Sequence, residues 1–352
     1  MATIFPPTAA RTWHYISTKG GLEKNLTLIT SNPVPKPTQS QHLIQVIATA
    51  LNPVDYKVAE IPIAGRFLVS RSKPATPCVD IAGRIVTPAT DSPFKRGDFV
   101  FGASGTSPFA GGGLSEFTIA GKDNVVKVPE GVSLVDAAAV PIAGLTAYQT
   151  IVPRVKKGDH IFINGGSGGT GIFGIQIAKA VGCHVTTSCS TPNVELCKSL
   201  GADEVVDYRK DSVAEALKAS GVLFDHIVDN VGSEDLELYW KCHEFTKPGA
   251  VYVLIAGSLT LSSVVEKAKV KFLPGFLGGG KRKLEGFFAS PNAADLAQIG
   301  VWMTEGKIRS VIDSKFSFEE APKAFEKLKT GRSRGKIIVD VAMETYEKSW
   351  SG

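Results

Sequence analysis

The sequence predicts an α/β protein in which a doubly wound parallel sheet is combined with a second, β-rich unit. Three observations predict this fold class. From about residue 129 to residue 288, short apolar runs alternate with helix-like segments, as in a parallel sheet with crossover helices. Residues 43–128 are instead strand-like and rich in turns. The segment after residue 292 is short for a domain of its own, so we expect it to complete the β-rich unit.

Length and composition predict a cytoplasmic protein of two domains. A chain of 352 residues is long for one core. Its net charge of +5 suits an anionic small ligand, and it lacks the basic clusters of nucleic-acid-binding proteins. We see no apolar run that could span a membrane and no signal-peptide core. The 5 cysteines lack C-x-x-C spacing, which favours free thiols over disulfides.

The expected elements follow from hydrophobic periodicity and turn residues. In the β-rich unit (residues 1–127 and 292–352) we expect strands at 43–48, 81–86, 117–120 and 336–341, and helices at 293–304 and 318–329. In the parallel-sheet unit (residues 128–291) we expect strands at 160–164, 184–189, 205–208, 225–229, 251–255 and 283–288. Its expected helices are 136–151, interrupted by Pro141 and Gly144, and 169–181, 193–200, 213–218 and 235–245.

A glycine-rich turn follows the strand predicted at 160–164. Its Gly166, Gly168 and Gly171 satisfy the dinucleotide-binding pattern G-x-G-x-x-G. The pattern serves a tight turn, a close approach of pyrophosphate to the backbone, and close helix–strand packing. The next helix then offers its N-terminal N–H groups to the phosphates. The expected phosphate-binding residues are Gly166, Ser167, Gly168, Gly169, Thr170 and Gly171.

The strand that follows the turn favours NADPH over NADH as the cofactor. An NAD site usually places Asp or Glu about 20 residues after the glycines, to bind the ribose 2′-hydroxyl. Ser188, Cys189 and Ser190 stand there instead, and no carboxylate would repel a 2′-phosphate. We therefore predict that Ser188 and Ser190 contact the cofactor, assisted by Tyr208. The same hydroxyl groups could also simply cap the helix that begins near residue 193.

Six segments in order along the chain resemble the medium-chain dehydrogenase/reductase superfamily, in its zinc-independent quinone oxidoreductase and enoyl reductase branch. They are N-P-V-D-Y-K at 52–57, D-I-A-G at 80–83, G-D-F-V-F-G at 97–102, A-G-L-T-A-Y at 143–148, L-G-A-D at 200–203 and S-R-G-K-I-I-V at 333–339. The resemblance implies a GroES-like catalytic domain made from both chain ends, and a Rossmann domain that binds NADPH between them. It also suggests a homodimer.

The residues at the catalytic zinc positions of that superfamily do not favour a metal here. The corresponding neighbourhoods are residues 53–56, 78–80 and 141–143, where Val79 and Ile142 have no ligating atom. Cys78 and Asp80 remain, but two side chains do not make a catalytic zinc site of three ligands. We therefore expect no metal.

Without a Lewis acid, hydride transfer to an already polarised acceptor is the expected reaction. The resemblance places the N-P-x-D-[WY]-K motif at the cleft between cofactor and substrate. We predict that Tyr56 and Lys57 donate hydrogen bonds to a developing enolate, and that Asn52 orients the nearby backbone. Alternatively, Tyr56 packs in the core and Lys57 is an ordinary solvated charge.

Further cofactor contacts are expected where later strands end, because ligands of doubly wound sheets bind outside the carboxyl ends of strands. The resemblance also places Thr146, on a predicted helix, at the nicotinamide end of the cofactor. The contacts expected after the later strands are Asn230, Val231, Ile255, Ala256 and Gly257.

Three functions are compatible with these features. The first is an NADPH-dependent reductase of quinones or α,β-unsaturated carbonyl compounds. The second is a trans-acting enoyl reductase on carrier-bound acyl chains, for which the basic residues 281–283 could meet an acidic carrier protein. The third is a regulatory protein that binds NADPH without catalysis.

Overall fold

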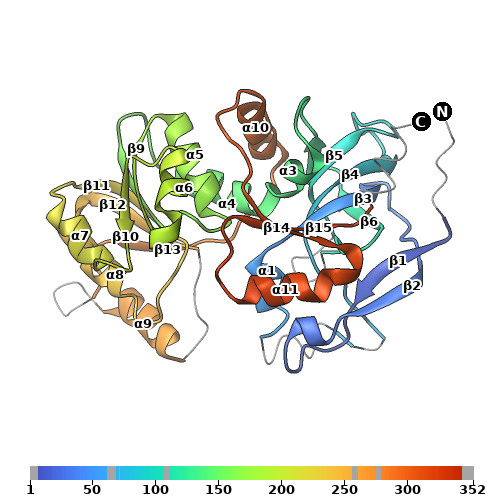
Figure 1. Ribbon diagram of the computed structural model, residues 1–352, viewed down its shortest axis with the longest axis horizontal. Helices are drawn as coiled ribbons and strands as arrows, with labels where there is room; N and C mark the ends of the chain where they lie inside the picture. Colours follow the sequence, from blue (N-terminus) through green and yellow to red (C-terminus); the bar gives the residue numbers. More distant parts are fainter. Residues whose placement is uncertain are drawn as a thin grey trace. The chain divides into compact units, whose positions relative to one another are not determined.

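The computed structural model describes residues 7–61, 69–70, 72–105, 111–255, 261–273 and 279–342. The chain forms two compact units. Unit 1 is Met1–Leu145 with Pro291–Gly352, and unit 2 is Thr146–Ser290. The two chain ends therefore share one unit, as Figure 1 shows by its blue and red segments. Residues 128–145, which we had assigned to the nucleotide-binding domain, cluster with unit 1 instead.

Unit 1 is built on a seven-stranded sheet whose order is β14-β15-β3-β4-β5-β7, with β6 paired to β3. Strand β15 comes from the C-terminal segment and pairs antiparallel with the long, buried strand β3. The prediction that the tail completes this unit is thus confirmed. The strands are β3 Gln41–Leu51, β4 Asp80–Thr87, β5 Phe99–Ala103, β6 Phe117–Gly121, β7 Val125–Lys127, β14 Ile312–Ser317 and β15 Lys336–Asp340; β1 Ala9–His14 and β2 Thr27–Pro33 form a separate hairpin.

The predicted helical stretch 136–151 is interrupted before Pro141, as expected, but not at Gly144. The stretch 136–151 is two helices, α3 Leu134–Ala138 and α4 Pro141–Ile151. The break lies between Ala138 and Pro141, and Pro141 begins α4, because the first turn of a helix tolerates a fixed φ and a missing N–H. Gly144 continues α4, where a Cβ would lie 2.8 Å from Val140 Cγ1. The remaining helices are α1 Pro53–Lys57, α10 Ala293–Thr304 and α11 Ala321–Lys329, with 3-10 turns η1 Leu22–Lys24 and η5 Phe318–Glu320.

Unit 2 is a six-stranded sheet, parallel throughout, in the order β10-β9-β8-β11-β12-β13. Numbered from β8, this is the doubly wound order 3-2-1-4-5-6, which reverses between β8 and β11. The strands are β8 His160–Asn164, β9 His184–Cys189, β10 Glu204–Asp207, β11 Phe224–Asp229, β12 Thr246–Leu254 and β13 Lys283–Gly286. The predicted parallel sheet is confirmed; β13 ends two residues earlier than expected.

The helices of unit 2 connect these strands. The predicted helix 235–245 was too long: α8 ends at Lys241, and the chain continues as a 3-10 turn. The predicted helix 193–200 is likewise shorter, since a 3-10 turn comes first. The helices and turns are α5 Gly171–Val181, η2 Thr191–Asn193, α6 Val194–Ser199, α7 Val213–Ala219, α8 Glu237–Lys241, η3 Cys242–Glu244 and α9 Leu261–Phe272.

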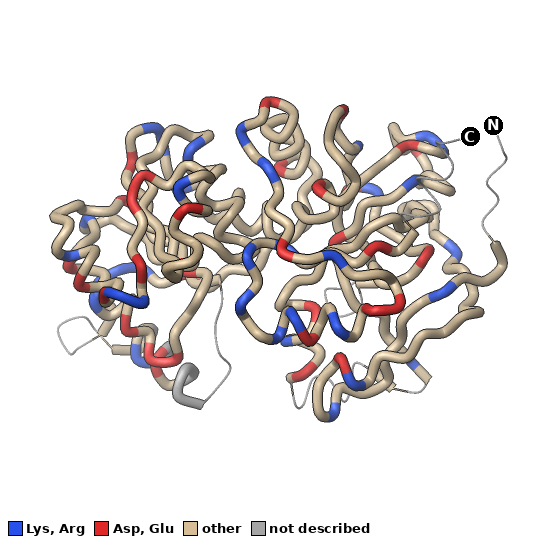
Figure 2. The backbone as a smooth tube through the Cα atoms, viewed as in Figure 1, with Lys and Arg blue, Asp and Glu red and all other residues tan. Residues whose placement is uncertain are grey.

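Basic and acidic residues are interspersed along both units, as Figure 2 shows. Within the described ranges, no helix is long and apolar enough to cross a membrane.

Candidate cofactor site and candidate active site

The turn between β8 and α5 has the geometry of a phosphate cradle. A Cβ on Gly166 would lie 2.1 Å from Thr187 Oγ1, and one on Gly171 would lie 2.2 Å from the Gly165 carbonyl oxygen. The protein's own packing therefore requires these two glycines. A Cβ on Gly168 would meet only the Gly165 oxygen, at an ordinary 3.5 Å. The fold leaves this space beside the backbone open, and the Thr170 side chain does not cap α5. The cradle fits a pyrophosphate.

A polar network crosses the carboxyl ends of the central strands, where the strand order reverses. Asn164 Nδ2 donates to Asp229 Oδ1 at 2.8 Å, and Tyr252 Oη donates to Asp229 Oδ2 at 2.6 Å. Asp229 also accepts the N–H groups of Val231 and Gly232, which fixes the turn after β11. Sequence reasoning did not single out Asn164 or Tyr252, because their positions mark them only once the strand order is known.

The structure separates the two predicted serines. Ser188 is fully buried; it donates to Asn164 and accepts the Gly165 N–H, so its hydroxyl belongs to the turn. Ser190 instead lies with Ser167 around a residue that sequence reasoning missed, Asn193. The Asn193 Nδ2 donates to Ser167 Oγ at 3.0 Å and to Ser190 Oγ at 3.2 Å. In the described part of the chain, the buried Asn193 Oδ1 has no hydrogen-bond partner.

The other predicted cofactor residues lie on strand ends and one helix. Tyr208 and Val231, after β10 and β11, expose 54% and 57% of their surface. Asn230 Nδ2 donates to the Asn164 carbonyl oxygen, and the Ile255 N–H to that of Asp229. Thr146 is buried in α4. Ala256 and Gly257 lie outside the described residues.

In unit 1, the predicted catalytic residues lie on α1 and at its start. The residue before α1 is Asn52, whose N–H donates to Asp55 Oδ2 at 2.7 Å. Lys57 is exposed at the end of α1 and has no ion pair with any described residue. Tyr56 is half-buried against the core, and the Lys329 ammonium lies 5.2 Å from its ring centroid. Burial, and secondly Glu60, raise the pKa of the Tyr56 phenol.

A buried ion network adjoins α1. Lys336 Nζ donates to Asp80 Oδ2 at 3.2 Å and to Asn52 Oδ1. Asn52 Nδ2 donates to the same Asp80 oxygen at 2.8 Å. The other oxygen, Asp80 Oδ1, accepts the Ile142 N–H at 2.8 Å. Lys336 was not identified as a site residue, because it reaches Asn52 from 284 residues away in the chain.

The donor set in this region does not fit a catalytic zinc ion. Val79 and Ile142 offer no ligating side-chain atom, and Asp80 and Asn52 are already bound to Lys336. Burial, and then the nearby carboxylates Asp55 and Asp80, raise the pKa of the Cys78 thiol. Among the described residues, no cluster of three or more His, Cys, Asp or Glu side chains could hold a metal ion.

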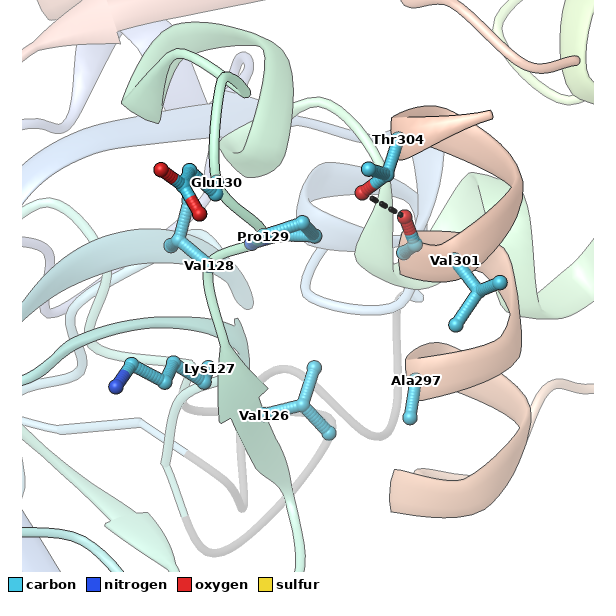
Figure 3. A pocket seen from close by; sticks show the side chains of 9 residues that line it. Val126, Lys127, Val128, Pro129, Glu130, Ala297, Val301 and Thr304 are labelled. Carbon is cyan, nitrogen blue, oxygen red and sulfur yellow. Dashed lines mark hydrogen bonds between the residues drawn. The ribbon is translucent and has the colours of Figure 1, made fainter. Parts of the chain in front are cut away.

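A separate hollow of about 350 Å³ lies on unit 1 between β7 and α10. Figure 3 shows Val126 and Pro129 on one side and Ala297 and Val301 on the other, with Thr304 bound to the Gly300 carbonyl oxygen. The predicted site residues do not line it.

Comparison with known proteins agrees with this architecture. Residues 38–130 match the family described as alcohol dehydrogenase GroES-like domain, and residues 200–339 match the one described as zinc-binding dehydrogenase. The structure resembles that of the quinone oxidoreductase from Coxiella burnetii, with a TM-score of 0.79 and 29% identity over 94% of this chain and 99% of that one.

Relatives with named activities extend along nearly the whole chain. The trans-enoyl reductase pgmF of Aspergillus terreus is 47% identical over 99% of this chain and 100% of its own length. The chloroplast envelope quinone oxidoreductase homolog of Arabidopsis thaliana is 34% identical over 88% of this chain and 92% of its own length. The chain therefore belongs to the medium-chain dehydrogenase/reductase superfamily of nicotinamide-dependent oxidoreductases, with a GroES-like and a Rossmann domain.

Proposed function

We propose that this protein is an NADPH-dependent reductase that transfers hydride to activated C=C bonds or quinones without a metal ion. One observation carries the proposal: the nucleotide cradle is intact, whereas Asp80, in one of the segments that carry metal ligands in related enzymes, is already bound to Lys336 and Asn52. An alcohol has to be activated by a Lewis acid or base before it loses hydride. An enone or quinone is already polarised and requires only positioning and a hydrogen-bond donor.

The residues of α1 supply that donor. A bound dinucleotide would supply hydride to the β-carbon of the acceptor, and negative charge would then develop on the acceptor's carbonyl oxygen. The Tyr56 phenol is protonated at neutral pH, because burial raises its pKa from an ordinary value that already lies well above 7, so it can donate to this oxygen. The exposed Lys57 ammonium is a second donor, free of ion pairs within the described residues. A proton from water or from one of these groups completes the reduction at the α-carbon.

The preference for NADPH is supported by the polar groups after β9. Ser190, Ser167 and Asn193 form a neutral hydrogen-bonding cluster, and no carboxylate follows β9 directly. Exposed Arg209 and Lys210 follow β10 and add positive charge on the same edge of the sheet. A 2′-phosphate at the end of β9 would therefore meet hydrogen-bond donors. The carboxylate of Asp207, which pairs with Cys189 in the sheet, is held by the Arg209 N–H and lies 3.9 Å from the Lys210 ammonium.

A carrier-bound acyl chain is the second candidate for the substrate. It is favoured by the full-length similarity to a trans-enoyl reductase, which exceeds the similarity to the quinone oxidoreductases. Both candidates share one chemistry, because an enoyl thioester and an enone accept hydride at the β-carbon. A cytoplasmic location and a homodimer stay predictions of the sequence.

The test is a panel of acceptors assayed by NADPH oxidation. It contains a quinone, a small enone, an enoyl thioester of N-acetylcysteamine and the same acyl group on a carrier protein. We expect turnover with NADPH, weaker turnover with NADH, and no loss after dialysis against a zinc chelator. Tyr56→Phe and Lys57→Ala should lower kcat. Failure of NADPH to bind, or loss of activity with the chelator, would refute the proposal.

A further inference from the structure

The three segments that carry zinc-ligand positions in related enzymes are held together by side chains in this chain. Asp80 is the common partner. Its Oδ1 accepts the Ile142 N–H at 2.8 Å, and its Oδ2 accepts Asn52 Nδ2 at 2.8 Å. The Lys336 ammonium closes the network by donating to both Asp80 and Asn52. The starts of α1 and α4 and the strand β15 therefore meet at the Asp80 carboxylate, at the start of β4.

This network is isolated from water. Asp80, Lys336 and Asn52 expose 0%, 2% and 4% of their surface. Removing two charges from water is so unfavourable that a buried ion pair is often no more stabilising than apolar residues of the same volume. Overall stability is therefore a weak reason for its presence, and conformational specificity is a stronger one.

The local geometry indicates that the network specifies the position of α1. Helix α1 has only five residues, too few to be stable by itself, and it carries Tyr56 and Lys57. Asn52 immediately precedes it, so anchoring the Asn52 side chain fixes where α1 begins. The adjacent Cys78 adopts a left-handed φ of 71°, and the Gly113 N–H holds its carbonyl oxygen at 2.7 Å. This strained turn delivers Asp80 to the start of β4.

We propose that the Lys336–Asp80–Asn52 network is a positioning centre that replaces a metal ion, and that Lys336 acts through it as a positioning residue for α1. The inference rests on the proposed reductase function for its kinetic consequence. A protein-borne ammonium binds the segments as a metal ion would, yet it presents no open coordination position to a substrate. The fold thereby keeps the arrangement of the site and gives up the Lewis acid.

The experiment compares Lys336→Met with Lys315→Met. Lys315 lies exposed on β14, the neighbouring strand, so its variant is a matched control for the same chemical change. We expect kcat of the folded Lys336→Met protein to fall about 10²-fold, the scale of a small displacement of catalytic groups. The Kd for NADPH, measured by fluorescence, should stay within about twofold of the wild type. The Lys315→Met variant should keep the wild-type values of both kcat and this Kd.

A double variant separates positioning from folding. Lys336→Met alone leaves Asp80 as an unpaired buried charge, so the melting temperature should fall. Lys336→Met/Asp80→Asn removes both charges, and we expect it to recover the melting temperature but not kcat. Recovery of both, or wild-type kcat in the single variant, would overturn the proposal. If Lys336→Met does not fold, the double variant and Asp80→Asn alone decide between these outcomes.

Hydrogen exchange tests the network without any turnover. In the Lys336→Met/Asp80→Asn protein, the amides of Asn52 and Ile142 should exchange at least about tenfold faster than in the wild type, while those of β8 do not change. If the wild type reduces no acceptor but exchange responds in this way, the proposed function fails and the positioning centre stands. Unchanged exchange at the amides of Asn52 and Ile142 would exclude the positioning centre.

Discussion

Gly168 and Gly171 of the β8–α5 turn are glycines for different reasons. Packing requires Gly171, whereas a bound pyrophosphate would require Gly168. Gly168→Ala places a methyl group where the protein leaves room but a pyrophosphate would lie. We expect little change in the melting temperature and a Kd for NADPH raised about tenfold or more, equivalent to ~1.4 kcal/mol. Gly171→Ala forces a Cβ against the Gly165 backbone and should destabilise unit 2 by about 1–3 kcal/mol.

Thermal unfolding and NADPH fluorescence titration of the two variants provide the check. We expect the two effects to separate: Gly168→Ala weakens NADPH binding, and Gly171→Ala lowers stability. Equal effects of both substitutions on the melting temperature would show that Gly168 is required by packing after all.

Asp55 is a second residue whose environment predicts a measurable effect. Complete burial raises the pKa of its carboxyl group from 3.8 to about 7. The folded state thus holds a proton that the unfolded state releases. The stability from this group is complete below pH 3.8 and is lost as the pH rises through 7. Asp55→Asn keeps an oxygen for the Asn52 N–H but does not titrate, so its free energy of unfolding should improve relative to wild type as the pH increases.

Urea unfolding of wild type and Asp55→Asn at several pH values from 5 to 8 measures this difference directly. The difference in free energy of unfolding between the two proteins cancels the contribution of the titratable groups that they share. Parallel curves for the two proteins would contradict the raised pKa.

At the scale of elements, the contact between α4 and β11 depends on a neutral histidine. His226 Nε2 lies 2.8 Å from the Thr150 carbonyl oxygen, so this nitrogen carries the proton of the neutral ring. Burial lowers the pKa of His226 from 6.5 to about 4. Its stabilising contribution is present above pH 6.5 and is lost as the pH falls through 4.

We therefore expect acid to loosen this pair of elements. Relative to His226→Gln, whose amide can donate the same bond without titrating, the wild type should lose about 3 kcal/mol of unfolding free energy between pH 7 and pH 4. Denaturant unfolding followed by circular dichroism measures this. A wild type that tracks the variant over the whole range would rule out a neutral buried imidazole as the cause.

Elements with a local signature could be predicted from the sequence, and those defined by distant partners could not. The β8–turn–α5 segment is encoded within a few residues by an apolar run and its glycines. The break before Pro141 was predicted correctly, whereas the break expected at Gly144 was wrong, because a glycine lowers helix propensity without ending a helix that packing stabilises. Asn193 and Lys336 were missed for another reason: Asn193 bonds to Ser167, 26 residues away, and Lys336 to Asn52, 284 residues away, and single-sequence patterns do not reveal such pairs.

At the scale of the whole molecule, unit 2, the Rossmann domain, is one continuous segment: the chain enters it after Leu145 and leaves it at Ser290. The nucleotide cradle, the Asn193 cluster and the Asp229 network all belong to that unit. A dinucleotide that binds only the folded form stabilises the protein by mass action. The extent depends on the ratio of its concentration to its Kd, so a stability measurement on the intact chain reports cofactor preference without a substrate.

We expect NADPH at about 100 times its Kd to raise the unfolding free energy by ~2.7 kcal/mol, and NADH at the same concentration to raise it less. The reason is the neutral cluster of Ser167, Ser190 and Asn193, which can donate to a 2′-phosphate. Ser190→Asp places a carboxylate there and should reverse the order of the two cofactors. Differential scanning calorimetry of the intact chain and of this variant gives both results. Equal stabilisation by the two cofactors in the wild type would locate the specificity elsewhere than after β9.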